Sequence, residues 1–137
     1  RQQMEKLKVL VVDDSRDTVE LMQQLLEFDG HEVSVAFRAE EALETLKAFG
    51  PDVVLCDIGL PGMTGYEFAQ AVREAEPGSP VYLVALTGYG SESDRARTRD
   101  AGFDEHLTKP VPRAELLAAL ERAARNRAAS APAATYT

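Results

Sequence analysis

Three short apolar runs in this 137-residue chain each lead directly into a polar residue, and this repeated arrangement restricts the folds open to it. The runs and the residues that follow them are 9–12 with Asp13 and Asp14, 53–56 with Asp57, and 81–86 with Thr87. Continuous apolar runs of this length are typical of parallel strands that are buried on both faces. The carboxyl ends of parallel strands meet at one edge of a sheet, where open α/β proteins usually bind their ligands. The sequence therefore predicts that these polar side chains, together with Lys109 after a short fourth segment, lie close together.

Segments with helical periodicity separate the expected strands along the whole chain. The expected strands are 7–13, 32–37, 53–57, 81–86 and 105–108, and the expected helices are 17–28, 39–48, 64–75, 91–101 and 112–125. Right-handed crossovers between parallel strands then favour a doubly wound, five-stranded α/β sheet. The second strand alternates apolar and polar residues and the fifth is short, so both are expected at the edges, which gives the order 2-1-3-4-5. The helix at 91–101 is rich in Arg, and Ala96 is its main expected inward residue.

The size and composition of the chain fit one globular domain. Hydrophobic residues make up 45% of the chain and charged residues 28%, as in ordinary globular proteins. The net charge of −8 argues against a nucleic-acid surface, and without a long apolar stretch or a signal segment no direct membrane contact is expected. The single cysteine, Cys56, fits a reducing cytoplasm. We expect a domain over residues 6–125, a linker or expression remnant at 1–5, and an Ala- and Pro-rich disordered tail at 126–137.

The predicted cluster of three carboxylates, one hydroxyl and one ammonium indicates metal-assisted chemistry on a phosphoryl group. Two like charges about 4 Å apart cost on the order of 4 kcal/mol at an effective dielectric constant of roughly 20, so three carboxylates gather only where a cation is expected. Mg²⁺ prefers hard oxygen ligands and would offset the charge that repels an incoming phosphoryl group. One direct carboxylate from the acid pair Asp13 and Asp14, together with Asp57 and the backbone carbonyl of Gly59, is expected to supply part of the ligand shell of the metal.

Four short motifs at predicted strand ends resemble those of the receiver domain of two-component response regulators. They are Val-Val-Asp13-Asp14-Ser, Leu-Cys-Asp57-Ile-Gly-Leu-Pro61-Gly62-Met63-Thr-Gly65, Ala-Leu-Thr87-Gly and Thr-Lys109-Pro110. Each motif alone is weak, but the four in this order are specific, and the resemblance covers roughly residues 6–125. It implies the flavodoxin-like receiver fold and a role in phosphorelay signalling.

By this resemblance, Asp57 accepts a phosphoryl group from a histidine kinase or a histidine phosphotransfer domain, while the acid pair holds Mg²⁺. Thr87 and Lys109 contact the phosphoryl oxygens, and the peptide bond between Lys109 and Pro110 is cis. Apart from its own phosphorylation and dephosphorylation, such a domain is not an enzyme. It is expected to act as a monomer or weak dimer in the cytoplasm, alone or as the cytoplasmic part of a larger sensor protein.

The chain departs from the family pattern at His106, three residues before Lys109. The family usually has Tyr or Phe there, an aromatic residue that commonly swings inward on phosphorylation. A switch role for His106 and an ordinary, partly exposed strand position are therefore equally open. Gly59 and Tyr89 stand where family members tune hydrolysis of the phosphoryl group. His31, after a Gly, is expected to be a simple turn residue.

Other functions on the same fold are alternatives with sequence features against them. Small Mg²⁺-dependent phosphatases with an aspartate nucleophile typically have two aspartates separated by one residue, whereas Asp13 and Asp14 are adjacent. A flavin-binding module would need a Ser-, Thr- and Gly-rich phosphate loop, but residues 13–17 are acidic. A pure interaction module, a receiver that no longer takes phosphate, would not need all five site residues. The stretch 102–111 looks most like receivers at the C-terminal end of hybrid sensor histidine kinases, which favours that parent over a stand-alone regulator.

Overall fold

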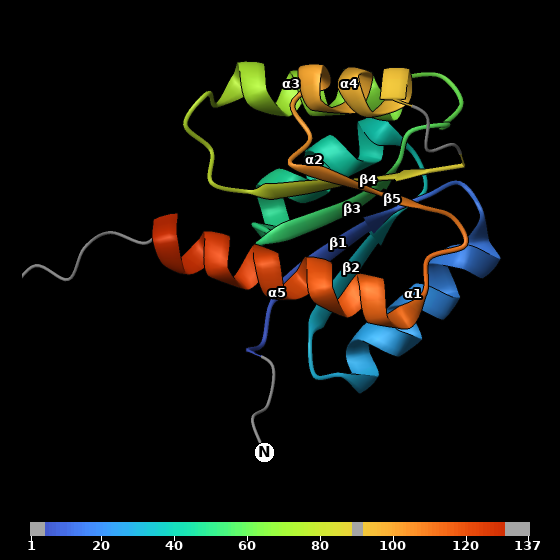
Figure 1. Ribbon diagram of the computed structural model, residues 1–137, viewed down its shortest axis with the longest axis vertical. Coiled ribbons are helices and arrows are strands. Elements are labelled where there is room, and N and C mark those ends of the chain that lie inside the picture. Colours follow the sequence, from blue (N-terminus) through green and yellow to red (C-terminus); the bar gives the residue numbers. More distant parts are fainter. Residues whose placement is uncertain (1–4, 89–91, 131–137) are drawn as a thin grey trace, which may run out of the picture.

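The computed structural model describes residues 5–88 and 92–130 and shows a parallel sheet with helices on both faces (Figure 1). The strands are β1 (Lys8–Val12), β2 (Glu32–Ala36), β3 (Val53–Asp57), β4 (Tyr82–Thr87) and β5 (Glu105–Thr108). The helices are α1 (Arg16–Phe28), α2 (Ala39–Phe49), α3 (Gly65–Ala75), α4 (Glu92–Ala101) and α5 (Arg113–Ser130). Strand and helix alternate along the described chain, as the sequence predicts.

The strand order β2-β1-β3-β4-β5 confirms the predicted doubly wound, flavodoxin-like topology. The two strands that end at acidic residues, β1 and β3, are neighbours, and Val12 lies opposite Cys56. The partly exposed strands β2 and β5 form the edges. Chain connections change direction between β1 and β3, and α/β sheets form their ligand crevice at the carboxyl ends of strands at such a point.

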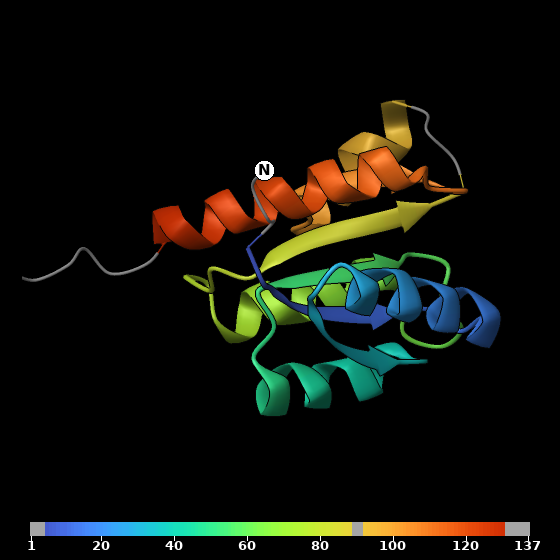
Figure 2. The same cartoon turned by 90° about the horizontal axis from the view of Figure 1, so that it is seen from below.

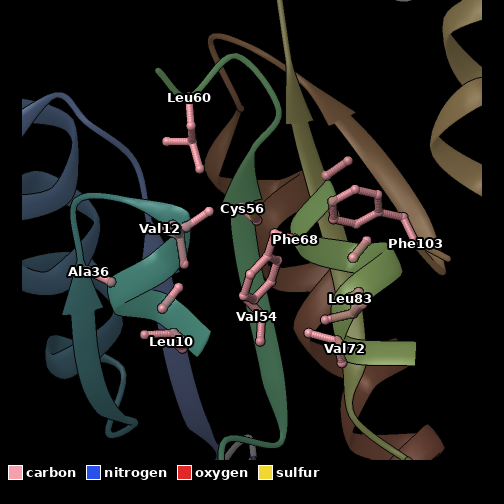
Figure 3. Packing of buried hydrophobic residues seen from close by; sticks show 14 of the residues in the cluster. Leu10, Val12, Ala36, Val54, Cys56, Leu60, Phe68, Val72, Leu83 and Phe103 are labelled. Atoms are coloured by element: carbon pink, nitrogen blue, oxygen red, sulfur yellow. The ribbon is translucent and has the colours of Figure 1, made fainter. Parts of the chain in front are cut away.

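Two apolar clusters on opposite faces of the sheet hold its three layers together. In β1, Val9 and Val11 pack with residues of α1 and α5, whereas Leu10 and Val12 pack with residues of α2 and α3. Figure 2 views the sheet from the side that α1 and α5 cover. All four side chains are fully buried, which explains why the strand is an unbroken apolar run in the sequence. Phe68 of α3 belongs to the same cluster as Leu10 and Val12 and packs beside the sheet (Figure 3).

Side-chain caps fix the starts of two helices beside the carboxyl edge of the sheet. The hydroxyl of Ser15 caps α1 by accepting a hydrogen bond from the Thr18 N–H at 3.3 Å. Thr64 and Glu67 form the predicted capping box at the start of α3, with hydrogen bonds of 3.1 and 2.9 Å. Caps of this kind contribute about 1 kcal/mol each to stability. They hold the loops after β1 and β3 against the sheet.

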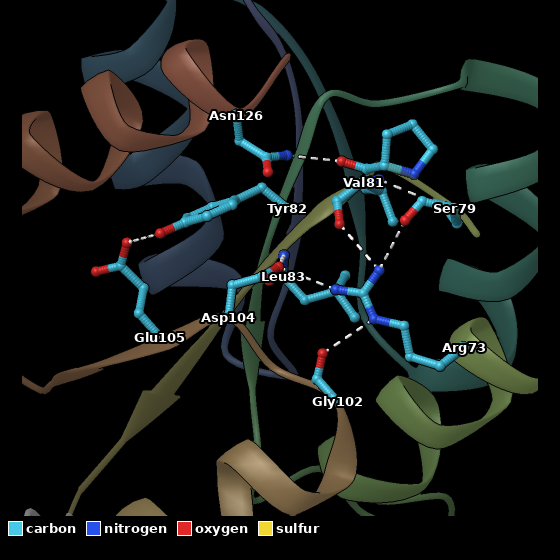
Figure 4. A network of polar contacts seen from close by, with 10 residues as sticks. Arg73, Ser79, Val81, Tyr82, Leu83, Gly102, Asp104, Glu105 and Asn126 are labelled. Carbon is cyan, nitrogen blue, oxygen red and sulfur yellow. Dashed lines mark hydrogen bonds and ion pairs between the residues drawn. The ribbon is translucent and has the colours of Figure 1, made fainter. Parts of the chain in front are cut away.

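Polar side chains hold the opposite edge of the sheet, where the strands begin. Arg73 of α3 donates hydrogen bonds to the carbonyl oxygens of Val81 and Gly102, at 3.1 and 3.0 Å, and pairs with Asp104 at 2.9 Å (Figure 4). Asp104 in turn accepts a hydrogen bond of 2.7 Å from the Leu83 N–H. These contacts tie the corner between α4 and β5 to α3 and to the start of β4.

The last helix differs from the prediction, which begins a disordered tail at residue 126. α5 continues to Ser130, and only residues 131–137 of the expected tail lie outside the described part of the chain. Asn126 donates a hydrogen bond of 2.8 Å to the Pro80 carbonyl, and Arg127 forms an ion pair of 3.0 Å with Asp52. Ala and Arg are strong helix formers, so the Ala-rich sequence extends the helix once its polar residues find partners. None of the described helices has both the length and the apolarity that a membrane span requires.

The inward residues of α4 also differ from the prediction, which named Ala96. Thr98 and Ala101 are buried, whereas Ala96 is only partly so. The Thr98 hydroxyl satisfies its hydrogen bond locally by donating to the Arg95 carbonyl at 2.8 Å, which allows this polar residue to be buried. Ser91, the predicted first residue of this helix, lies outside the described residues.

Candidate functional site

Three carboxylates gather at the carboxyl edge of the sheet, as the sequence predicts. Asp13 and Asp14 follow β1 directly, and Asp57 is the last residue of the neighbouring β3. One oxygen atom from each of the three lies within 4.8 Å of the others. Asp13 is buried, Asp57 is partly buried and Asp14 is exposed, so Asp14 is the member of the cluster that faces solvent.

Lys109 brings one positive charge to this acid cluster. Its ammonium lies 3.0 Å from Asp13 Oδ2 and 3.4 Å from Asp57 Oδ2. The backbone holds Lys109 beside the end of β4, because its N–H donates a hydrogen bond of 2.6 Å to the Thr87 carbonyl. The next peptide bond, to Pro110, is cis as predicted. Burial disfavours the charged ammonium, but the hydrogen bond to Asp13 and the charge of Asp57 outweigh it and raise the pKa of Lys109. Lys109 therefore stays protonated throughout the neutral range.

Backbone N–H groups orient the two inner carboxylates. The Ser15 N–H donates to Asp13 Oδ1 at 2.9 Å, and the Gly59 N–H donates to Asp57 Oδ1 at 3.0 Å. Each of these carboxylates thus has one oxygen fixed by the backbone and the other directed at Lys109. The predicted metal contact of the Gly59 carbonyl stays a prediction.

The donor set fits a hard divalent cation. Three carboxylates and one ammonium leave an excess of two negative charges within a few ångströms, which a divalent ion would balance. Among the described residues, all of the ligand atoms in the cluster are oxygens, the type that Mg²⁺, Ca²⁺ and Mn²⁺ prefer, with no sulfur or imidazole ligand. The residues present therefore suit the Mg²⁺ that the sequence predicts.

The remaining predicted residues follow the strand ends. Thr87 is the buried last residue of β4 and lies opposite Thr108 in the sheet. His106 lies opposite Ala85 and is partly buried. Because its neighbour Leu107 packs in the cluster of α1 and α5, alternation along β5 puts His106 on the face of the sheet that α4 covers. Its switch role stays a prediction, and Tyr89 lies outside the described residues.

His31 is not the simple turn residue that the sequence predicts. Its side chain is buried, and Nδ1 accepts a hydrogen bond of 3.0 Å from the Leu7 N–H at the start of the sheet. Burial lowers the pKa of His31, while the carboxylate of Asp29 acts in the opposite direction. The preceding Gly30, with φ of 95°, turns the chain so that the imidazole points inward.

An apolar surface beside the site was missed by reasoning from sequence. Leu21 and Phe28 of α1 are 59% and 86% exposed. Next to them, a groove of about 420 Å³ runs between α1 and the start of α5, with Leu25, Pro110 and Leu116 among its lining residues. The signal was present in the sequence, because Leu21 and Phe28 fall outside the helical face that Val19, Met22 and Leu26 bury.

A family model of the response regulator receiver domain matches residues 9–121. The chain belongs to this family. Apart from Lys8, the first residue of β1, the match covers all five strands and every site residue described above, and it agrees with the motifs at the four strand ends.

Curated relatives and solved structures extend this assignment. The chain is 40% identical over 116 residues to an uncharacterized 14.6 kDa protein of Leptolyngbya boryana, covering 85% of this chain and 88% of that protein. It is 36% identical to the response regulator MprA of Mycolicibacterium vanbaalenii and to the transcriptional regulatory protein TrcR of Mycobacterium tuberculosis, covering 82% and 83% of this chain. In those two comparisons the matched region spans only 48% and 44% of the relative.

The chemotaxis response regulator CheY4 of Vibrio cholerae superposes with a TM-score of 0.80 at 32% identity, covering 87% of this chain and 99% of that structure. A CheY-like receiver domain protein of Methanospirillum hungatei gives 0.81 at 30% identity, covering 91% and 99%. Both comparisons span the receiver fold almost completely.

Proposed function

We propose that this receiver accepts a phosphoryl group on Asp57 from a phosphohistidine of a histidine kinase or histidine phosphotransfer domain, with Mg²⁺ held by the acid cluster. One observation carries the proposal. Asp57 ends a central strand between the acid pair and Lys109, so a nucleophile, a metal-binding carboxylate set and a fixed cation meet at one point. A group that only stabilised the fold would not need three carboxylates around a single lysine.

The side chains divide the chemistry between them. An oxygen of the Asp57 carboxylate attacks phosphorus, the P–N bond of the phosphohistidine breaks, and its electron pair stays on the imidazole nitrogen. Lys109 already contacts Asp57 and would move its ammonium onto an oxygen of the transferred phosphoryl group. The Thr87 hydroxyl is proposed to donate to another of these oxygens. Bound Mg²⁺ would neutralise charge shared by the carboxylates and the phosphoryl group.

Acetyl phosphate offers a direct test without a partner protein. The purified domain is incubated with acetyl phosphate and Mg²⁺, and its intact mass is measured. We expect a gain of one phosphoryl group that EDTA prevents and that Asp57→Asn abolishes. A phosphoryl group that Asp57→Asn still acquires would refute the assignment, and labelling that proceeds unchanged in EDTA would refute the role of the metal. Beryllofluoride binding with and without Mg²⁺ gives an independent readout.

The apolar surface on α1 supports a protein as the phosphodonor. Leu21, Leu25 and Phe28 are spaced four and three residues apart, so they form one stripe along the helix beside the groove at Pro110. The groove connects this stripe to the acid cluster, because Leu21 and Lys109 both line it and Lys109 contacts Asp13 and Asp57. A helix of a kinase or phosphotransfer domain that docks on the stripe would bring its phosphohistidine to the site.

We infer that the receiver works in a response regulator of a two-component system. The named relatives MprA and TrcR support this context, whereas the hybrid-kinase hypothesis depends on residues 102–111 alone. The same proposal places the protein in the cytoplasm, as a monomer or weak dimer that contacts its partners transiently. The single, buried Cys56 agrees with a reducing compartment.

A further inference from the structure

Gly65, the first residue of α3, lies directly against the backbone of the proposed phosphoacceptor. A Cβ atom at this position would lie 2.5 Å from the Ile58 Cα and 2.6 Å from the Asp57 carbonyl oxygen. Carbon atoms that are not bonded to each other normally stay about 3.5–4.0 Å apart. The Gly65 N–H also donates a hydrogen bond of 3.2 Å to the Ile58 carbonyl, so the start of the helix and the end of β3 are in close contact.

The helix has little freedom to move away from this contact. The capping box of Thr64 and Glu67 holds its first turn, and Phe68, one turn further, is fully buried against the sheet. On its other side, the end of β3 is held by β4, because the Ile58 N–H donates a hydrogen bond of 3.2 Å to the Leu86 carbonyl. A side chain at residue 65 would therefore displace the peptide between Asp57 and Ile58.

The carboxylate of Asp57 depends on this peptide for its position. Its Oδ1 accepts from the Gly59 N–H at 3.0 Å, and its Oδ2 lies 3.4 Å from the Lys109 ammonium. A shift of the backbone by about 1 Å would misalign both contacts, and displacements of that size cost reactions about a hundredfold in rate.

We propose that Gly65 is a positioning residue for phosphorylation: the bare backbone at the start of α3 sets where the Asp57 carboxylate lies relative to Lys109 and the acid pair. This inference rests on the proposed role of Asp57. It concerns the contact and not backbone strain, because Gly65, unlike Gly62 with φ of 74°, is not among the glycines with a positive φ.

The substitution Gly65→Ala tests the inference, with Gly78→Ala as its matched control. Gly78 lies in the loop after α3, also lacks a positive φ, and has open space where a Cβ would be. Labelling by acetyl phosphate at saturating Mg²⁺ is followed by intact mass and corrected for the folded fraction from circular dichroism. We expect the limiting rate of Gly65→Ala to fall at least tenfold, with a similar loss of beryllofluoride affinity, and that of Gly78→Ala to stay within twofold of the parent. A folded Gly65→Ala that is labelled at the parent rate would overturn the inference.

A measurement on the parent protein keeps the inference testable if Gly65→Ala does not fold. Beryllofluoride and Mg²⁺ should shift the amide NMR resonance of Gly65, whose N–H donates to the Ile58 carbonyl, and that of Ile58, the residue directly after Asp57, while the amide of Gly78 stays in place. Unshifted resonances of Gly65 and Ile58 in the ligand-bound parent would overturn the inference. If the parent itself is not labelled on Asp57, the proposed function fails instead, so the two failures are distinguishable.

Discussion

The acid cluster should destabilise the metal-free protein, and Asp14→Asn isolates this effect. Asp14 is the exposed member of the cluster, so its replacement opens no cavity. It is also not the cap of α1, because the hydroxyl of Ser15 has that role. Replacing the carboxylate by an amide therefore removes mainly its repulsion by Asp13 and Asp57. We expect the variant without metal to be more stable than the parent.

The magnitude follows from the distances. The carboxylate oxygens lie within 4.8 Å of one another, so each pair repels by at least about 0.9 kcal/mol in bulk water, the appropriate limit for an exposed group, and by at least roughly 3.5 kcal/mol at a dielectric constant of about 20. Two pairs at the lower value give about 2 kcal/mol, of which Lys109 offsets roughly half. Loss of a negative charge near the start of α1 costs about 0.3–1 kcal/mol. The net gain is of the order of 0.5 kcal/mol, a rise in melting temperature of roughly 2 °C for a domain of this size.

Melting curves of the parent, Asp14→Asn and the control Asp17→Asn in EDTA and in excess Mg²⁺ test the reasoning. Asp17 lies in the first turn of α1 but outside the cluster, so its replacement should give no gain in stability. Mg²⁺ should stabilise the parent and Asp17→Asn by mass action but leave Asp14→Asn nearly unchanged. If Asp14→Asn in EDTA melts clearly below the parent, like-charge repulsion in the cluster does not determine the stability of the metal-free domain.

Three further predictions concern the rest of the domain. Because the pKa of His31 is lowered in the folded protein, the unfolded chain takes up a proton at a higher pH, and the free energy of unfolding should fall as the pH drops below about 6.5. Thermal melts of His31→Gln should lose this part of the pH dependence, and equal pH dependence in both proteins would contradict the prediction. The Arg97 guanidinium of α4 lies 4.1 Å from the Tyr66 ring centroid of α3, so Tyr66→Leu should speed amide exchange in α4 by about two- to fivefold, whereas Tyr66→Phe should keep the ring and the parent rate. Unchanged exchange in Tyr66→Leu would show that this stacking does not hold α4 in place. Phe28→Ser should leave labelling by acetyl phosphate unchanged but slow phosphoryl transfer from a phosphorylated histidine kinase roughly tenfold, because about 1.5 kcal/mol of apolar contact with the docked kinase is lost. Equal transfer rates from the kinase to the parent and to the variant would exclude Phe28 from the docking surface.

The fold and the central site could be predicted because both depend on the same local signal. An apolar run that ends in a polar residue gives a buried strand and also the position where the chain emerges from the sheet, so Asp13, Asp57 and Thr87 were located with their strands. Edge strands could be assigned because β2 alternates and β5 has only 4 residues. The strand order then followed from the known handedness of crossovers.

The features that were missed depend on partners distant in sequence. Nothing local to Arg127 shows that Asp52 will lie 3.0 Å away, so a segment of low apolar content was predicted as a tail although it forms the end of α5. His31 follows a turn signal correctly, but its burial depends on the backbone of Leu7, on another strand. The contact of Gly65 with Asp57 depends on how closely α3 approaches β3, a distance that residue types alone do not determine.

The two ends of the strands differ in how well their charges are matched. Where the strands end, three carboxylates lie together and one lysine pairs with two of them, which leaves an excess of negative charge that is unfavourable without a cation. At the other edge, charges are matched, with Arg73 bound to Asp104 and two carbonyl oxygens, and Arg127 paired with Asp52. The matched edge fixes the starts of the strands and the C-terminal end of α4, so the fold tolerates excess charge where the strands end. A ligand that offsets this excess of negative charge binds favourably at the carboxyl ends of the strands. The movement that binding drives should therefore begin in the loops there, while the opposite edge of the sheet stays fixed.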